Sequence, residues 1–194
     1  SFIMSPDGRS IDVGGDDQRA GGHEIWLTVP VDSDTYPGND PGPHTMLIGV
    51  HEKENQAKLE WLLSRADGYI GFVTGQTPAF MEALNDMRPI VGNIYHRGLA
   101  LIDGSTSPGT APQTMAVGQK APYGIVDIWL DTPNASQDSI QEALNRLETI
   151  AMNRGFAVGV IHPLPVSYQQ VLAWIKDLKG KGLVLAPLSA TTGY

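Results

Sequence analysis

The chain of 194 residues contains no cysteine. This absence excludes disulfide bonds and thiolate-ligated zinc sites, but it fits a reducing cytosol as well as a bacterial envelope. Long apolar runs are also absent, because no stretch approaches the roughly 18 apolar residues that a membrane-spanning helix needs. The sequence therefore predicts no membrane span in this chain, and it leaves the cellular compartment open.

Positive charge is scarce. The chain has 13 Lys and Arg against 21 Asp and Glu, which gives a net charge of −8, and its basic residues form no cluster. Phosphate-rich partners need basic patches, so this balance argues against binding to nucleic acid or to an anionic membrane. With 41% hydrophobic residues the chain has enough apolar side chains for a sizeable core. We expect a single domain over residues 1–194.

Several motifs that mark known chemistries are missing. The sequence has no GxGxxG or GxxxxGK[ST] loop for nucleotides, no GxSxG elbow for a serine nucleophile and no HExxH zinc pair. Four histidines have no histidine four residues away, so no local zinc pair is predicted; they are His23, His44, His51 and His96. Of these, His51 is expected to begin a helix and His96 to lie near a helix end.

Short apolar runs alternate with amphipathic stretches along the chain. The predicted strands are 1–4, 24–29, 69–73, 99–103, 124–130, 157–162 and 183–189. The predicted helices are 51–66, 85–97, 136–155 and 167–180. Ser167 is expected to cap the last helix, and Pro89 to sit in the first turn of its helix. Nearly continuous apolar strands between helices predict an α/β fold with a parallel sheet, either open or closed into a barrel.

Polar residues recur where the apolar runs end. They are Thr28, Asp32, Thr74, Asp103, Ser105, Asp131, His162 and Ser189. Because sites in parallel α/β folds gather at the carboxyl ends of strands, this recurrence predicts a functional site there. The alternative for each aspartate is a turn or helix cap. For His162 the alternative is a core histidine that closes the top of the sheet.

The one long irregular stretch, residues 32–49, is rich in proline and glycine. A loop of this length in a compact domain is usually functional or disordered, and its prolines favour a defined course. We expect it to fold over the carboxyl ends of the strands and to bring Asp40 or His44 near His162.

Several stretches match a known family in order and spacing. The most specific are YPGNDPGPHT, within residues 36–47, and the His-Pro-x-Pro turn in VGVIHPLP, residues 158–165. Supporting matches are 20–31, 87–90, 99–107, 127–131 and 183–190. The chain resembles the divergent polysaccharide deacetylase family, a bacterial branch of the NodB-like carbohydrate esterases. The resemblance implies a distorted (β/α) barrel of about seven mostly parallel strands, action on acetylated glycans, and export to the periplasm.

The chain departs from the pattern of the active relatives. In those relatives, an Asp pair on the first strand and histidines in two later motifs form a metal site, and a histidine on a late strand acts as the acid. Thr28 and Gly75 stand where the two motif histidines are expected. Asp103, Asp131 and His162 are retained. The first strand with its Asp pair is expected to be missing from the chain as given.

Three functions follow as hypotheses. The first is a deacetylase-like protein with a degenerate metal site and a retained glycan-binding cleft. The second is an active metal-dependent deacetylase with rearranged ligands, and the third is a structural partner protein of the cell envelope. The predicted catalytic residues are His162 and Asp103. The predicted substrate-binding residues are Thr28, Asp32, Asp40, His44, Thr74, Ser105 and Asp131.

The expected partner is a glycan or another acetylated carbohydrate. No cofactor is expected and no metal ligand is assigned within the chain, because threonine is a weak zinc ligand and glycine offers no side chain. Zinc binding is expected only if a missing N-terminal segment supplies carboxylates.

Overall fold

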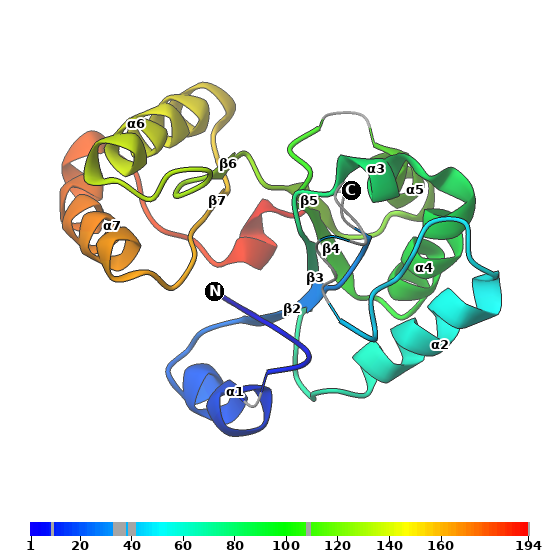
Figure 1. Cartoon of the computed structure of the whole chain (residues 1–194). Coiled ribbons are helices and arrows are strands. Elements are labelled where there is room, and N and C mark those ends of the chain that lie inside the picture. The colour runs from blue at the N-terminus through cyan, green and yellow to red at the C-terminus, as the bar shows by residue number, and fades with distance from the viewer. Residues whose placement is uncertain (9, 33–37, 39–41, 108–109, 194) are drawn as a thin grey trace. The chain divides into compact units, whose positions relative to one another are not determined.

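The computed structural model of the chain describes residues 1–8, 10–32, 38, 42–107 and 110–193. The chain divides into two compact units (Figure 1). The first comprises Ser1–Ile125 with Thr192–Tyr194, and the second comprises Val126–Thr191. Each unit has its own parallel strand pairs and its own cluster of buried apolar side chains, so each is described by itself.

The first unit is built on a five-stranded parallel sheet with its strands in sequence order. The strands are β1 (Phe2–Met4), β2 (Ile25–Val29), β3 (Gly71–Thr74), β4 (Ala100–Asp103) and β5 (Tyr123–Ile125). Because each strand pairs with the next one along the chain, every connection is a crossover that carries at least one helix. The predicted α/β fold with a parallel sheet is confirmed.

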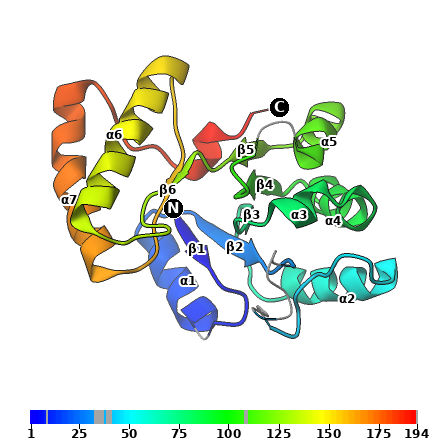
Figure 2. The ribbon, with the colours of Figure 1, turned by 45° about the horizontal axis from the view of Figure 1, so that its top comes forward.

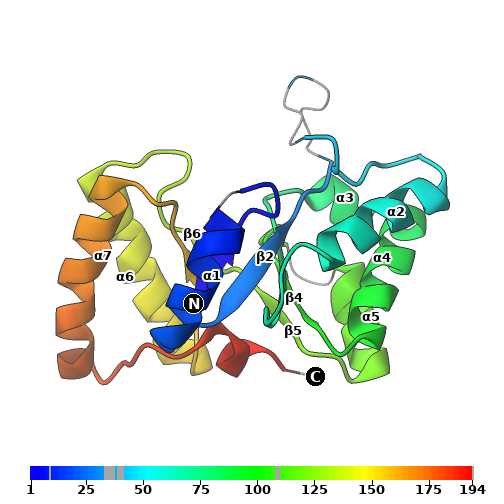
Figure 3. The same ribbon diagram turned by 90° about the horizontal axis from the view of Figure 1, so that it is seen from below.

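Five helices connect these strands. They are α1 (Ser10–Ala20), α2 (Glu52–Leu63), α3 (Pro78–Glu82), α4 (Leu84–His96) and α5 (Ala111–Gln119). Helices α2, α4 and α5 lie side by side (Figure 3). Their apolar residues share one core cluster with Ile11 of α1 and with alternate strand residues such as Leu27. The helices therefore pack on one face of the sheet, and the opposite face carries Trp26, Val73 and Ile102.

Two glycines allow β3 and β4 to approach closely. A Cβ atom on Gly71 would lie 2.1 Å from the Ala100 carbonyl oxygen, and one on Gly104 would lie 2.0 Å from the Thr74 carbonyl oxygen. No side chain fits at either position without moving the backbone. The strand pair thus depends on glycine at both ends, at Gly71 where β3 begins and at Gly104 directly after Asp103.

The second unit contains a two-stranded parallel sheet and two helices. Its strands are β6 (Ile128–Trp129) and β7 (Gly159–Val160), and its helices are α6 (Gln137–Arg154) and α7 (Pro165–Leu178). Helices α6 and α7 pack against each other (Figure 2). Ser136 and Ser139 form a capping box at the start of α6, and Gly155 ends that helix with a φ of 94°. Two short 3₁₀ helices follow α7, at Lys179–Lys181 and Leu188–Thr191.

Two strand predictions are wrong. The single strand predicted over 124–130 is two strands, since β5 ends at Ile125 and β6 begins at Ile128 in the other unit. The strand predicted over 183–189 is absent from the described structure, where Val184 is 83% exposed and Leu185 is 61% exposed. An apolar run alone does not make a strand, because a strand also needs a neighbour that accepts its hydrogen bonds.

Two helix predictions need correction, and three helices were not predicted. Helix α7 begins at Pro165, so Ser167 lies inside its first turn and does not cap it. Pro89 lies inside α4 and not in its first turn, because that helix begins at Leu84. The carbonyl left without a donor belongs to Asn85, an exposed residue that water can serve. Helices α1, α3 and α5 were missed because their short, glycine- or proline-containing sequences show no strong apolar stripe.

The predicted barrel of about seven strands is not confirmed. In the part of the chain that the structure describes, the larger sheet has five strands, and two further strands pair separately. No helix of the described residues combines the length and the apolar character that crossing a bilayer requires.

Candidate functional site

The carboxyl ends of β3 and β4 bring three of the predicted site residues together. Thr74 is the last residue of β3, and its hydroxyl accepts a hydrogen bond of 2.9 Å from the amide of Gly104. Asp103 is the last residue of β4, and its Oδ1 accepts a hydrogen bond of 2.9 Å from the amide of Ser105. The predicted gathering of polar residues at strand ends therefore exists in the first unit.

The carboxylate of Asp103 is fully buried, with 0% exposure. Its Oδ2 accepts hydrogen bonds from the hydroxyls of Thr110, at 2.8 Å, and Tyr123, at 3.2 Å. Burial, together with the nearby charge of Asp103, raises the pKa of Tyr123, so this hydroxyl stays protonated and remains a donor. Asp103 thus ties the end of β4 to the start of α5 and to β5, and its catalytic role stays a prediction.

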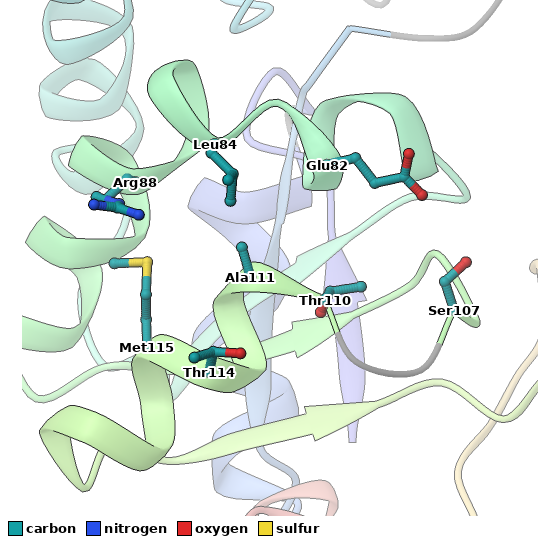
Figure 4. Close-up of a pocket in the computed structure, with 8 residues that line it drawn as sticks. All are labelled: Glu82, Leu84, Arg88, Ser107, Thr110, Ala111, Thr114 and Met115. Carbon is teal, nitrogen blue, oxygen red and sulfur yellow. The ribbon is translucent and has the colours of Figure 1, made fainter.

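A pocket of about 460 Å³ opens beside this cluster (Figure 4). Thr110, which binds Asp103, is also part of the pocket wall. The polar side chains of the lining are Glu82, Arg88, Ser107, Thr110 and Thr114. Arg88 lies beside Met115 and Leu84, whereas Glu82 and Ser107 lie at the other side (Figure 4). The volume of this pocket lies in the range typical of small-ligand sites. Sequence reasoning did not find Arg88 or Thr114, because they lie within helices and not at strand ends.

The other predicted residues of the first unit have separate surroundings. Thr28 lies within β2 opposite Val73. Asp32 holds the chain that returns from the long loop: its amide donates to the Met46 carbonyl at 2.8 Å, and its Oδ2 accepts from the Ile48 amide at 3.4 Å. These residues lie in β2 and the segment that follows it.

His44 packs against α2. Its ring stacks on Trp61, with ring centroids 3.4 Å apart, and its Nδ1 lies 3.4 Å from Oδ1 of Asp7. Asp40 lies outside the described residues. The predicted approach of this loop to His162 concerns two separate units and stays a prediction.

The second unit contains a buried carboxylate bonded to an exposed imidazole. Asp131 follows β6 and has a fully buried side chain, whereas the side chain of His162, which follows β7, is 52% exposed. Oδ1 of Asp131 lies 2.8 Å from Nδ1 of His162, and Oδ2 accepts a hydrogen bond of 2.8 Å from the His162 amide. The pairing of β6 with β7 places the two residues side by side.

Burial alone would raise the pKa of Asp131. Hydrogen bonds from Ser167 and from the ring and amide of His162 outweigh this effect and lower the pKa below its ordinary value. Asp131 is therefore ionised at neutral pH, and its negative charge faces Nδ1 of His162. Because the carboxylate occupies Nδ1, Nε2 is the nitrogen of His162 left to exchange a proton.

Two further side chains complete this arrangement. The Trp129 ring lies 5.7 Å from the His162 ring, centroid to centroid, and is inclined to it by 27°. Ser167 is fully buried, and its hydroxyl donates to Oδ2 of Asp131 at 2.6 Å. Sequence reasoning treated Ser167 only as a helix cap. Its position in the first helical turn after the His-Pro-x-Pro segment is the signal that places it near His162.

A family model described as divergent polysaccharide deacetylase matches residues 4–192. The chain belongs to the divergent polysaccharide deacetylase family. This match confirms the resemblance seen in the sequence, and no curated protein matches the chain. Among solved structures, the chain is similar to the crystal structure of the uncharacterized protein ATU2773 from Agrobacterium tumefaciens C58. The TM-score is 0.90 and the identity is 30%, over 97% of this chain and 76% of that one.

The resemblance to the divergent polysaccharide deacetylase family implied a metal site. The side chains of this chain show whether such a site is present. Within the described residues, no three His, Cys, Asp or Glu side chains are placed to hold a metal ion. Asp103 already accepts hydrogen bonds on both oxygens, and Thr28 and Gly75 supply no imidazole. The residues described here do not fit the zinc site that the resemblance implied.

Proposed function

We propose that this protein binds an acylated carbohydrate and that His162 transfers the proton when the acyl group is removed. The observation that carries the proposal is the Asp131–His162 pair, in which a buried, ionised carboxylate orients a half-exposed imidazole. A general acid–base needs this combination of a fixed ring and an accessible nitrogen. A histidine that only filled the top of the sheet would not need its ring in solvent.

The chemistry assigned to this chain's own residues is a proton transfer in two steps. Nε2 of His162 takes a proton from a water molecule as its oxygen attacks the acyl carbonyl carbon. The resulting imidazolium is stabilised by Asp131 and gives the proton to the sugar oxygen or nitrogen as its bond to the acyl carbon breaks. The acid and the deacylated sugar leave, and His162 returns to its starting state.

The pocket beside Asp103 belongs to the first unit and supports carbohydrate binding by that unit. Hydroxyls and charged groups on its wall suit a ligand rich in hydroxyl groups, and its apolar side suits the face of a sugar ring. We retain Thr28, Asp32, Asp40, His44, Thr74 and Ser105 as proposed substrate-binding residues of the same protein. Export to the periplasm, implied by the family resemblance, belongs to this proposal as well.

The test measures acetate release from acetylated oligosaccharides by the full chain and by His162→Ala. We expect the variant to lose at least about 100-fold in kcat, the usual contribution of a general acid–base group. Ser64→Ala, which removes an exposed hydroxyl in the other unit, is the matched control and should keep wild-type activity. A His162→Ala variant with wild-type activity would overturn the assignment. The same assay after dialysis against a chelator tests for a metal, and we expect the activity to persist.

A second candidate is carbohydrate binding without hydrolysis. Thr28 and Gly75 favour this second candidate, because they stand where the family resemblance leads us to expect histidines. The resemblance implies that active relatives use those imidazoles. Calorimetric binding of the same oligosaccharides, without acetate release from any of them, would select this candidate. Absence of both binding and release would leave the structural partner protein as the remaining hypothesis.

A further inference from the structure

Three donors hold the carboxylate of Asp131, and one of them has no part in the proton transfer assigned to His162. Oδ1 faces Nδ1 of His162, whereas Oδ2 accepts from the His162 amide and from the Ser167 hydroxyl. The Ser167 contact, at 2.6 Å, is the shortest of the three. Asp131 and Ser167 are both fully buried, so no solvent reaches the carboxylate to replace a lost donor. A lost hydroxyl would leave Oδ2 with the amide alone.

The chain segment that carries His162 also delivers this hydroxyl. The amide of Leu164 donates to the His162 carbonyl at 2.8 Å, which turns the chain directly after the histidine. Pro165 then begins α7, and its fixed φ suits the first position of a helix. Ser167 follows within the same first turn, so the geometry of the turn sets where its hydroxyl points. One short segment therefore presents both the imidazole and the group that fixes its carboxylate partner.

We propose that Ser167 is a positioning residue whose hydroxyl holds the Asp131 carboxylate in the orientation that keeps the proton of neutral His162 on Nδ1. The inference rests on the proposed function, since it concerns the same imidazole. Which ring nitrogen of a neutral histidine carries the proton is set by the hydrogen bond that the other groups offer it. With Oδ2 fixed by two donors, Oδ1 stays directed at Nδ1, and Nε2 stays unprotonated and ready to accept a proton. Without the hydroxyl, the carboxylate can rotate, and the second tautomer becomes populated.

A buried serine that only satisfies a polar neighbour would affect stability and leave the tautomer unchanged. The tautomer is therefore the property that separates the two roles. It can be read from two-bond proton–nitrogen correlations of the His162 ring in the uniformly ¹⁵N-labelled full chain, at a pH where the ring is neutral. This measurement needs neither substrate nor activity.

We expect wild-type His162 to show the Nδ1–H form, and Ser167→Ala to lower the ratio of the two tautomers by about fivefold, as expected for loss of one side-chain hydrogen bond. Ser167→Thr, which keeps the hydroxyl, should restore the ratio. Ser64→Ala should leave it unchanged. If Ser167→Ala fails to fold, Ser167→Cys keeps nearly the same volume with a much weaker donor and should give the same shift. A wild-type ratio in the folded variant would overturn the proposal.

Acetate release by the same variants separates this inference from the proposed function. We expect Ser167→Ala to lower kcat with little change in KM, and Ser167→Thr to recover it. Should neither wild type nor His162→Ala release acetate, the hydrolytic function fails, and the tautomer ratio still decides the role of Ser167. Full activity in His162→Ala together with a shifted tautomer ratio in Ser167→Ala would reject the proton-transfer role of His162 and keep the positioning role of Ser167.

Discussion

Asp103, the last residue of β4, and Asp131, which follows β6, are both buried aspartates, and they differ in their hydrogen-bond partners. Asp103 in the first unit accepts from the Ser105 amide and from the hydroxyls of Thr110 and Tyr123. All three residues are buried: Ser105 lies in the turn after β4, Thr110 directly precedes α5, and Tyr123 begins β5. Asp131 in the second unit also accepts from a buried hydroxyl, but its other partners are the amide and the half-exposed ring of His162. The two carboxylates are therefore similarly buried, but only Asp131 has a partner whose side chain reaches solvent.

The difference teaches how a buried carboxylate comes to take part in chemistry. The residues that donate to Asp103 are buried, so its hydrogen bonds tie together β4, α5 and β5. Asp131 instead bonds an imidazole that is half in solvent, so its hydrogen bond orients a ring that is accessible from outside. On this comparison, the contacts of Asp103 tie β4 to α5 and β5, and those of Asp131 support the proposed role of His162. The catalytic role of Asp103 stays a prediction.

The largest effect that we predict concerns Asp103. Asp103→Ala should lower the free energy of unfolding by about 3 kcal/mol, because it leaves the buried Ser105 amide without its acceptor and opens a space between β4 and α5. The measurement is unfolding in urea. Asp17→Ala, at an exposed position of α1, is the control and should change stability by less than about 0.5 kcal/mol. A similarly small effect of Asp103→Ala would show that its hydrogen bonds do not tie β4 to α5.

A smaller effect is predicted for the pH dependence of the second unit. The folded-state pKa of Asp131 is lowered, so its contribution to stability is present above the ordinary aspartate pKa near 3.8 and is lost as pH falls through the lower folded value. Asp131→Asn should remove this part of the acid sensitivity in urea unfolding between neutral and acidic pH. The pKa of Glu148 is also lowered, by its hydrogen bond with Lys181, so Glu148 adds to the acid sensitivity in the same direction. That part of the acid sensitivity should remain in Asp131→Asn. An acid sensitivity identical to wild type would contradict the assigned hydrogen bonds.

The sequence predicted the framework better than the site. Continuous apolar runs located β1 to β4 because buried parallel strands carry that pattern on both faces. The polar strand ends drew attention to Asp103, Asp131 and His162, whose functional roles stay predictions. Their partners could not be predicted, since Tyr123 lies within a strand and Ser167 matched the pattern of a helix cap. Hydrogen bonds between distant side chains depend on how strands pair, and a single sequence does not state that pairing.

The smallest effect on stability is predicted for His162→Ala. It contrasts with the large loss of activity that we expect for the same variant. His162→Ala should lower the free energy of unfolding by about 1 kcal/mol or less, because half of the ring is already in solvent. The Ser167 hydroxyl and the amide of residue 162 would still serve Oδ2 of Asp131, and water would reach Oδ1 through the space left by the ring. Urea unfolding of the variant beside Asp103→Ala gives the comparison directly. A loss of more than about 3 kcal/mol would mean that the ring is a packed core group, as large-to-small core substitutions cost that much. His162 would then be a structural histidine like the donors around Asp103, and the contrast between the two aspartates would disappear.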